Sequence, residues 1–252
     1  MSSHISMGEV PKKEKKGGVK AHVLYDIEAQ VPAFYTVTTA SKHDSTAMCS
    51  IHYEPNAYYI FDRTYDSFKE LYRIHLTGSF FVVRVKYTMV KWKRRVPKYA
   101  LTDAEVKLTG YLSKKKYPES SRLVRYYDEE DDHEFTFLTN AIHISALDVA
   151  NLYKKRWLVE LFFKWLKQHF KIKRFWGTTE NAVRIRISVA IITYRLVAIV
   201  QHDMRLKRST YKVLQILSIS LTDKTKLRDL FDKTNFNDVK ELDCSLFEGL
   251  FD

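Results

Sequence analysis

The sequence predicts a mixed α/β fold, because β-rich runs and amphipathic helical segments follow one another along the chain. Two β-rich runs with the pattern of a hairpin come first, and further strand-like runs follow them. Long helical segments dominate the C-terminal part. Hydrophobic residues make up 45% of the 252 residues and aromatic residues 14%, so the chain can bury a packed core.

The N-terminal third of the chain is predicted to hold the first part of the core, residues 19–86. Residues 1–18 are polar and rich in lysine, and we expect them to form a disordered leader. The runs 19–27 and 31–38 predict a hairpin. The later runs predict a short helix at 41–50, a buried strand at 57–61, a helix at 67–76 and a strand at 80–86.

Residues 87–143 have a different character, with a basic stretch followed by short alternating runs. The basic stretch contains Lys91, Lys93 and Arg94, and it either follows a DNA backbone or forms a solvated basic hairpin. Strands are predicted at 106–112, 122–127 and 134–138. We therefore predict a small antiparallel β-insertion in this region.

Residues 144–252 are predicted to be the helical part of the core. Its first helix contains the stretch 152–169. Ser145 is a suitable N-cap for this helix, with Asp148 at the third helical position. Further helices are predicted at 179–207, 211–221 and 224–232.

Four polar residues of the first of these helices share one side: Tyr153, Arg156, Glu160 and Lys167. At about 100° per residue, their spacing keeps them within roughly 60° of one another on an α-helix. The helix also has an apolar surface for packing against a core, and we assign Trp157 and Trp165 to such packing.

The charge balance favours a polyanionic partner. Lysine plus arginine number 42 against 30 for aspartate plus glutamate, a formal net charge of +12. Nucleic acid is the first candidate and an anionic membrane surface the second. The two cysteines have no ligand-like spacing, which argues against a zinc site or a disulfide framework and fits a reducing cytoplasm. We expect no membrane span, because the most apolar stretch, 187–200, is short and contains Arg195.

Two carboxylates stand out as candidates for metal-dependent chemistry. Asp62 follows the buried strand at 57–61, where α/β proteins often place functional groups, although a turn or cap aspartate fits the same position. Glu160 lies mid-helix among basic neighbours, where it either pairs with Arg156 or Lys164 or serves a divalent cation. Mg²⁺ prefers carboxylate oxygens together with substrate phosphates.

Two motifs carry a resemblance to a known family. Tyr153-x-x-Arg156-x-x-x-Glu160-x-x-x-x-x-x-Lys167 resembles the Tyr-Arg-Glu-Lys signature of bacterial insertion-sequence transposases with a DDE catalytic core. Asp62-Arg63-x-Tyr65 is similar to the second-aspartate motif of that family. The similarity extends from about residue 17 to the C-terminal helices.

The resemblance implies a ribonuclease-H-like catalytic core with an antiparallel β-insertion and a helical C-terminal part. It implies cleavage of transposon ends with Mg²⁺, or with Mn²⁺ in its place, and strand transfer into target DNA by a homodimer on DNA in the bacterial nucleoid. Asp62 and Glu160 would be the catalytic metal ligands. The residues expected to contact DNA are Arg63, Tyr65, Tyr153, Arg156, Lys164 and Lys167, together with Lys91, Lys93 and Arg94 of the basic stretch.

Two positions depart from the family pattern. Thr64 stands where the family usually has glycine, and the first aspartate of the triad has no counterpart, since neither Asp26 nor Asp44 matches its position. A central strand, between the hairpin and the strand before Asp62, also has no counterpart. The prediction is therefore an N-terminally truncated transposase with impaired catalysis. A catalytically dead DNA-binding remnant and a general metal-dependent nuclease are the alternatives.

Overall fold

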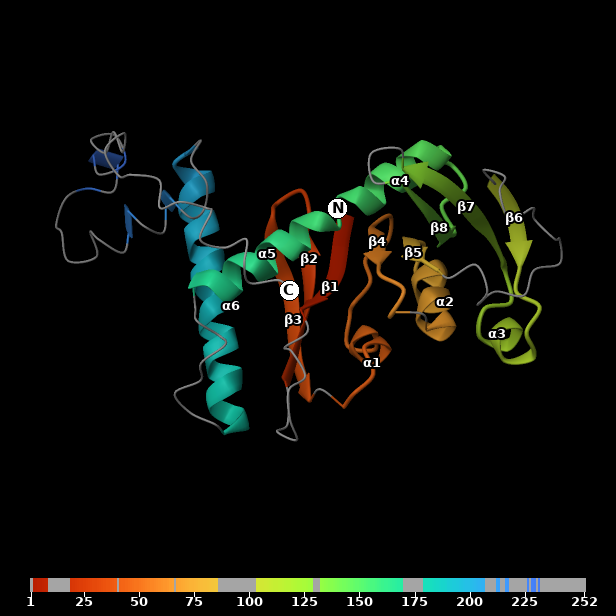
Figure 1. Cartoon of the computed structure of the whole chain (residues 1–252), viewed down its shortest axis with the longest axis horizontal. Coiled ribbons are helices and arrows are strands. Elements are labelled where there is room, and N and C mark those ends of the chain that lie inside the picture. Colours follow the sequence, from red (N-terminus) through yellow and green to blue (C-terminus); the bar gives the residue numbers. More distant parts are fainter. Residues whose placement is uncertain are drawn as a thin grey trace. The chain divides into compact units, whose positions relative to one another are not determined.

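The computed structural model describes most of the first 206 residues and a few short pieces beyond them. The described residues are 2–8, 19–39, 41–65, 67–85, 103–128, 132–169, 179–206, 212–213, 216–217, 226, 228–229 and 231. They contain one eight-stranded mixed sheet in the order β3-β2-β1-β4-β5-β8-β7-β6 (Figure 1). Its strands are β1 (Ser2–Gly8), β2 (Val19–Asp26), β3 (Val31–Thr39), β4 (Tyr58–Phe61), β5 (Phe80–Arg84), β6 (Asp103–Lys107), β7 (Ser120–Asp128) and β8 (His133–Thr139).

The middle of the sheet is parallel and both of its sides are antiparallel. Strand β1 pairs with β4 in parallel, and β4 pairs with β5 in parallel. On one side β1, β2 and β3 are antiparallel neighbours, which confirms the predicted hairpin. On the other side β8, β7 and β6 continue from β5 as an antiparallel series. The antiparallel strands predicted within 87–143 are thus present, and they extend the main sheet.

Strand β1 overturns the prediction for part of the leader. Ser2–Gly8 was expected to be disordered, and no strand was expected between the hairpin and β4. The structure instead places β1 in that central position, with backbone pairing to β2 on one side and β4 on the other. The short polar run has too little hydrophobic periodicity to predict a strand from sequence. The pairing of β1 depends on strands that are distant in sequence. Residues 9–18 lie outside the described residues.

The described helices are α1 (Ser45–Met48), α2 (Phe68–Leu76), α3 (Tyr111–Lys116), α4 (Ala146–Lys154), α5 (Trp157–His169) and α6 (Glu180–Asp203). The predicted helices at 41–50, 67–76 and 179–207 correspond to α1, α2 and α6. The strand predicted at 106–112 ends at Lys107, because Gly110 begins α3 as its N-cap. The helices predicted at 211–221 and 224–232 lie largely outside the described residues.

The long helix predicted around 152–169 is two helices, α4 and α5. Arg156 donates its backbone N–H to the carbonyl of Tyr153 at 2.9 Å, and Leu158 donates to Lys155 at 3.1 Å. These bonds span three residues, so the chain tightens between the helices and the α-helical ladder is interrupted. Tyr153 therefore belongs to α4, whereas Glu160 belongs to α5.

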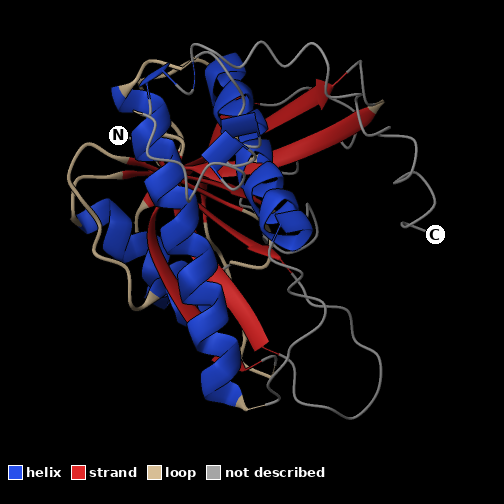
Figure 2. Ribbon diagram, turned by 90° about the vertical axis from the view of Figure 1, so that its left-hand side faces the viewer, coloured by secondary structure: helices blue, strands red, loops and turns tan. Residues whose placement is uncertain are grey.

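Both faces of the sheet are covered, and alternate residues of each strand point to opposite faces. In β4, Tyr59 and Phe61 belong to the core cluster that also contains Leu71 and Ile74 of α2. Ile60 lies between them in sequence and packs in the other cluster, which contains residues of α4. Figure 2 shows helices on both sides of the strands.

The chain divides into two compact units, Met1–Arg195 and Leu196–Asp252. The first contains the whole sheet and helices α1 to α5. The second has its own small apolar cluster, formed by Val197, Val213, Ile216 and Phe231. Among the described residues, no helix combines the length and the hydrophobicity that crossing a membrane requires.

Candidate active site

Asp62 lies directly after β4, at the carboxyl end of a parallel strand. It continues the strand's alternation from Ile60, so it belongs to the face of the sheet that carries α4. Its neighbour in the parallel register is Arg84, because Phe61 pairs with Val83. The carboxylate is half-buried, and its Oδ1 accepts the backbone N–H of Arg63 at 2.8 Å.

Tyr153 approaches Asp62 from α4. Its ring is buried and packs on Phe137 with the ring centroids 4.8 Å apart. Its hydroxyl donates to Oδ1 of Asp62 at 3.3 Å. Burial raises the pKa of the Tyr153 hydroxyl, and the negative charge of Asp62 raises that pKa further. The hydroxyl therefore stays protonated and acts as a donor to the carboxylate.

Arg156 connects Tyr153 with Glu160. Its guanidinium lies 5.6 Å from the centroid of the Tyr153 ring and forms an ion pair with the Glu160 carboxylate four residues later. The Arg156 side chain is 18% exposed and that of Glu160 is 49% exposed. This ion pair is one of the alternatives that the sequence leaves open for Glu160. An unbroken series of side-chain contacts therefore leads from Asp62 through Tyr153 and Arg156 to Glu160.

The donor set suits a divalent cation in part. Asp62 and Glu160 supply the oxygen ligands that Mg²⁺ prefers. Glu160 is neutralised by Arg156, so its carboxylate would have to exchange that partner for a cation. Within the described part of the chain, no group of three or more histidine, cysteine, aspartate or glutamate residues could hold a metal ion.

Arg84 is a site residue that the sequence analysis missed. Its guanidinium stacks 4.8 Å from the centroid of Phe135, and Nη2 lies 3.0 Å from Nε2 of His133. It is also close enough to Tyr153 to lower the pKa of that hydroxyl, against the larger effect of burial. An arginine at the end of the strand predicted at 80–86 was the available signal. Its relation to Asp62 depends on the register of β4 and β5, which the sequence does not reveal.

The other predicted DNA contacts divide into exposed, buried and undescribed residues. Arg63, Lys164 and Lys167 are exposed, and the two lysines lie on the same face of α5 as Glu160. Tyr65 is only 1% exposed and packs in the core cluster with Phe61, so its side chain is not placed to make the DNA contact expected of it. Lys91, Lys93 and Arg94 lie outside the described residues.

The two tryptophans predicted to pack in the core have different environments. Trp165 is buried and packs edge-on against Tyr194, with the centroids 4.8 Å apart. Trp157 is 59% exposed, so the prediction of core packing is wrong for it. Trp157 is the first residue of α5 and directly follows the tight turn after α4.

The remaining aspartates considered in the sequence have structural partners. Asp26 accepts the backbone N–H groups of Glu28 and Ala29 at 2.9 and 3.0 Å in the turn after β2. Asp44 forms an ion pair with Lys20 at 2.9 Å. Neither residue joins the contacts around Asp62.

The turn after Asp62 forms despite Thr64. The backbone N–H of Tyr65 donates to the carbonyl of Asp62 at 3.0 Å, which closes the turn. Thr64 is not among the described residues with a positive φ, so the position does not require glycine here.

Comparisons with known proteins identify relatives of the chain. Residues 2–196 match the family described as the transposase DDE domain. A Sinorhizobium fredii protein named as transposase y4zB is 34% identical over 223 residues, which cover 84% of this chain and 61% of that protein. A Geobacillus stearothermophilus protein named as the transposase for insertion sequence element IS5377 is 31% identical over 192 residues, 74% of this chain and 50% of that protein.

A solved structure has the same fold. The piggyBac transposase, in the cryo-EM structure of its synaptic complex with hairpin DNA, aligns with a TM-score of 0.57 at 12% sequence identity. The alignment covers 92% of this chain and 56% of the piggyBac chain. The chain thus spans about half to three-fifths of the length of the relatives it matches. By the match over residues 2–196, the chain belongs to the transposase DDE domain family.

Proposed function

We propose that this chain is the catalytic domain of a bacterial insertion-sequence transposase that cleaves the ends of its element and joins them to target DNA, with catalysis impaired because no residue matches the first aspartate of the triad. The observation that carries the proposal is the continuous set of contacts from Asp62 through Tyr153 and Arg156 to Glu160. These four residues come from both signature motifs. The strand order β3-β2-β1-β4-β5 and the family match support a ribonuclease-H-like core extended by β6, β7 and β8.

Asp62 and Glu160 would hold the divalent cation, with Mg²⁺ the first choice and Mn²⁺ a substitute. Such a cation would supply polarisation of a phosphate oxygen and activation of the attacking oxygen, which is that of water in cleavage and that of a DNA 3′-hydroxyl group in joining. Tyr153 engages Oδ1 of Asp62 and thereby fixes the orientation of that carboxylate.

The cations around the two carboxylates suit a DNA backbone. Arg84 and Arg156 lie beside Tyr153, and Lys164 and Lys167 line the exposed face of α5 next to Glu160. Phosphates would otherwise be repelled by the carboxylates, so positive side chains at this place favour binding of DNA. We propose transposon-end DNA and target DNA as partners. A homodimer, with one copy for each end, is the assembly that paired cleavage would need.

The proposal is tested by incubating the purified chain with labelled DNA that carries the inverted repeats flanking its gene. We expect slow strand cleavage at the repeat ends in Mg²⁺, no cleavage in EDTA, and loss of cleavage in Asp62→Asn and Glu160→Gln. Glu180→Gln is the matched control, because Glu180 is also an exposed helical glutamate paired with an arginine four residues later. This control should cleave as the native chain does.

The two alternatives give different results in the same experiment. A DNA-binding remnant would retard the repeat DNA in a gel and leave it uncut, which would contradict the catalytic part of the proposal. A general nuclease would cut DNA without repeats at the same rate. Cleavage that persists in both carboxylate variants would overturn the assignment of the site.

A further inference from the structure

Arg122 is a buried cation that the proposed chemistry does not use. It lies in β7, and its side chain is 10% exposed. It shares a face of the sheet with Val124, which belongs to the cluster under α4. A buried arginine needs a full set of hydrogen-bond acceptors to offset the loss of hydration. The partners of Arg122 therefore indicate what its burial organises.

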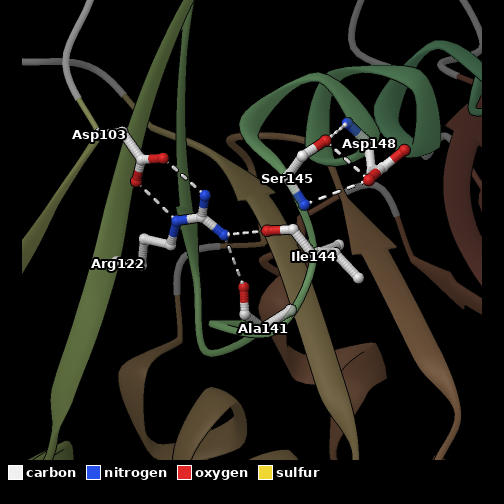
Figure 3. Close-up of polar contacts among 6 residues, drawn as sticks. All are labelled: Asp103, Arg122, Ala141, Ile144, Ser145 and Asp148. Atoms are coloured by element: carbon white, nitrogen blue, oxygen red, sulfur yellow. Dashed lines mark hydrogen bonds and ion pairs between the residues drawn. The ribbon is translucent and has the colours of Figure 1, made fainter.

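The Arg122 guanidinium joins the edge strand β6 to the loop before α4 (Figure 3). Its Nε and Nη2 atoms donate to the two carboxylate oxygens of Asp103, both at 2.6 Å. Its Nη1 atom donates to the carbonyl of Ala141 at 3.1 Å and to that of Ile144 at 2.5 Å. The paired hydrogen bonds from Arg122 hold the pKa of Asp103 below its usual range.

The carbonyl of Ile144 belongs to the peptide group at which α4 begins. The N–H of that same peptide group, on Ser145, donates to Oδ2 of Asp148 at 3.1 Å, and Ser145 Oγ accepts from the backbone of Asp148 at 3.1 Å (Figure 3). Arg122 thus binds one side of the peptide group whose other side forms the capping box. The guanidinium therefore fixes the orientation of the peptide group between Ile144 and Ser145, from which α4 starts.

We propose that Arg122 is a positioning residue that sets the direction of α4 and so holds Tyr153 against Asp62. The proposal rests on the proposed function in that it takes the Tyr153–Asp62 contact to matter for catalysis. Tyr153 lies eight residues after Ser145 in sequence, roughly 12 Å along the helix at 1.5 Å per residue. A tilt of about 10° at the start of α4 would move Tyr153 by roughly 2 Å, enough to break its 3.3 Å hydrogen bond.

The start of the same loop is anchored separately, to β5. Asn140 accepts the backbone N–H of Phe81 at 2.8 Å and donates to the carbonyl of Ser79 at 2.8 Å. Thr139 Oγ1 donates to the carbonyl of Phe81 at 2.5 Å and accepts the N–H of Ala141 at 3.0 Å. A change at Arg122 would therefore release the end of the loop next to α4 and leave its beginning attached to the sheet.

The test compares Arg122→Lys with Arg125→Lys. A lysine keeps the charge of Arg122 but cannot reproduce the paired bonds to Asp103 together with those to the two carbonyls. Arg125 is the matched control, because it is also a buried arginine of β7 bound to a carboxylate, that of Glu134 on β8. It lies three residues from Arg122 and therefore faces the opposite side of the sheet.

Hydrogen exchange followed by mass spectrometry measures the local effect without requiring activity. In Arg122→Lys, we expect peptides of α4 to exchange at least about tenfold faster, with peptides of α2 within about twofold of the native chain. In Arg125→Lys, α4 and α2 should change by the same factor. In cleavage of end DNA, Arg122→Lys should lower kcat by roughly three- to tenfold and leave KM within about twofold, because the side chain acts on Tyr153 and not on DNA.

Three results would overturn the proposal: unchanged exchange of α4 in Arg122→Lys, equal acceleration of α4 and α2 in that variant, or a selective effect on α4 from Arg125→Lys. If the native chain cleaves no DNA, the proposed function fails, and the exchange experiment still decides whether Arg122 holds α4.

Discussion

At the scale of single residues, the Tyr153 hydroxyl determines which oxygen of Asp62 remains available. Oδ1 already accepts from Tyr153 and from the backbone of Arg63. Tyr153→Phe removes one hydrogen bond and keeps the ring that packs on Phe137. A hydrogen bond of this kind contributes about 1 kcal/mol, so end cleavage should slow by roughly three- to tenfold with little change in stability. Single-turnover cleavage assays measure the effect, and an unchanged rate would show that the hydroxyl has no role.

His22 makes the stability of the fold depend on pH. It is 2% exposed, and its Nε2 lies 2.7 Å from Oγ1 of Thr38. Burial lowers the pKa of His22 from 6.5 to about 4, against an opposing effect of Asp44. Between pH 6.5 and 4, His22 therefore binds a proton in the unfolded chain but not in the folded chain. The free energy of unfolding falls as pH falls through this window.

The expected loss of unfolding free energy between pH 7 and pH 5 is about 2 kcal/mol from this residue. Urea unfolding of the native chain and of His22→Gln at both pH values measures it. The glutamine variant should lose less stability on acidification, because its side chain does not titrate. An equal loss in both proteins would place the pH dependence in other groups.

At the scale of elements, the N-cap of α4 connects stability with the site. Ser145 and Asp148 form a complete capping box, so Ser145→Ala should lower the free energy of unfolding by about 1 kcal/mol. Ser67 is the matched control, since it is the N-cap of α2 but forms no side-chain capping bond. Ser67→Ala should change stability by less than about 0.5 kcal/mol in urea unfolding. Equal effects of the two changes would show that the capping box contributes nothing.

The break between α4 and α5 is a feature that helical periodicity in the sequence did not predict. The spacing of Tyr153, Arg156 and Glu160 correctly indicated that these side chains belong together, and the structure brings them into contact. It wrongly placed them on one continuous helix. The turn at Lys155 contains neither proline nor glycine, so the local sequence does not predict it.

At the scale of the whole molecule, local sequence patterns predicted the individual strands and helices better than they predicted which strands pair in the sheet. The hairpin of β2 and β3 and the buried strand β4 follow from composition and short-range alternation. The central position of β1 and the joining of β8 to β5 depend on pairing between distant segments. The same limit hid Arg84, whose place beside Asp62 is a matter of strand register.

The positive charge of the molecule should appear in the salt dependence of DNA binding. With a net charge of +12, affinity should fall steeply as salt competes for the phosphates. Lys167→Ala removes one exposed cation of α5 and should lower the slope of log K against log salt by about 0.9. Lys114→Ala in α3 is the control, since it removes the same charge from a helix that packs with α2, on the face of the sheet opposite to that of Asp62. Fluorescence anisotropy over a salt series measures both slopes. Identical slopes in the two variants would show that Lys167 does not contact DNA phosphates.

The central claim, that Asp62 and Glu160 form one divalent cation site, is tested most directly by binding of Mn²⁺ to the DNA-bound chain. Electron paramagnetic resonance counts free Mn²⁺ during a titration, and it requires no catalytic activity. We expect a saturable site that is lost in Asp62→Asn, in Glu160→Gln and in the double variant alike. Glu180→Gln should retain that site. Retention of the site in either carboxylate variant would contradict the claim, because the cation would then be held by one carboxylate without the other.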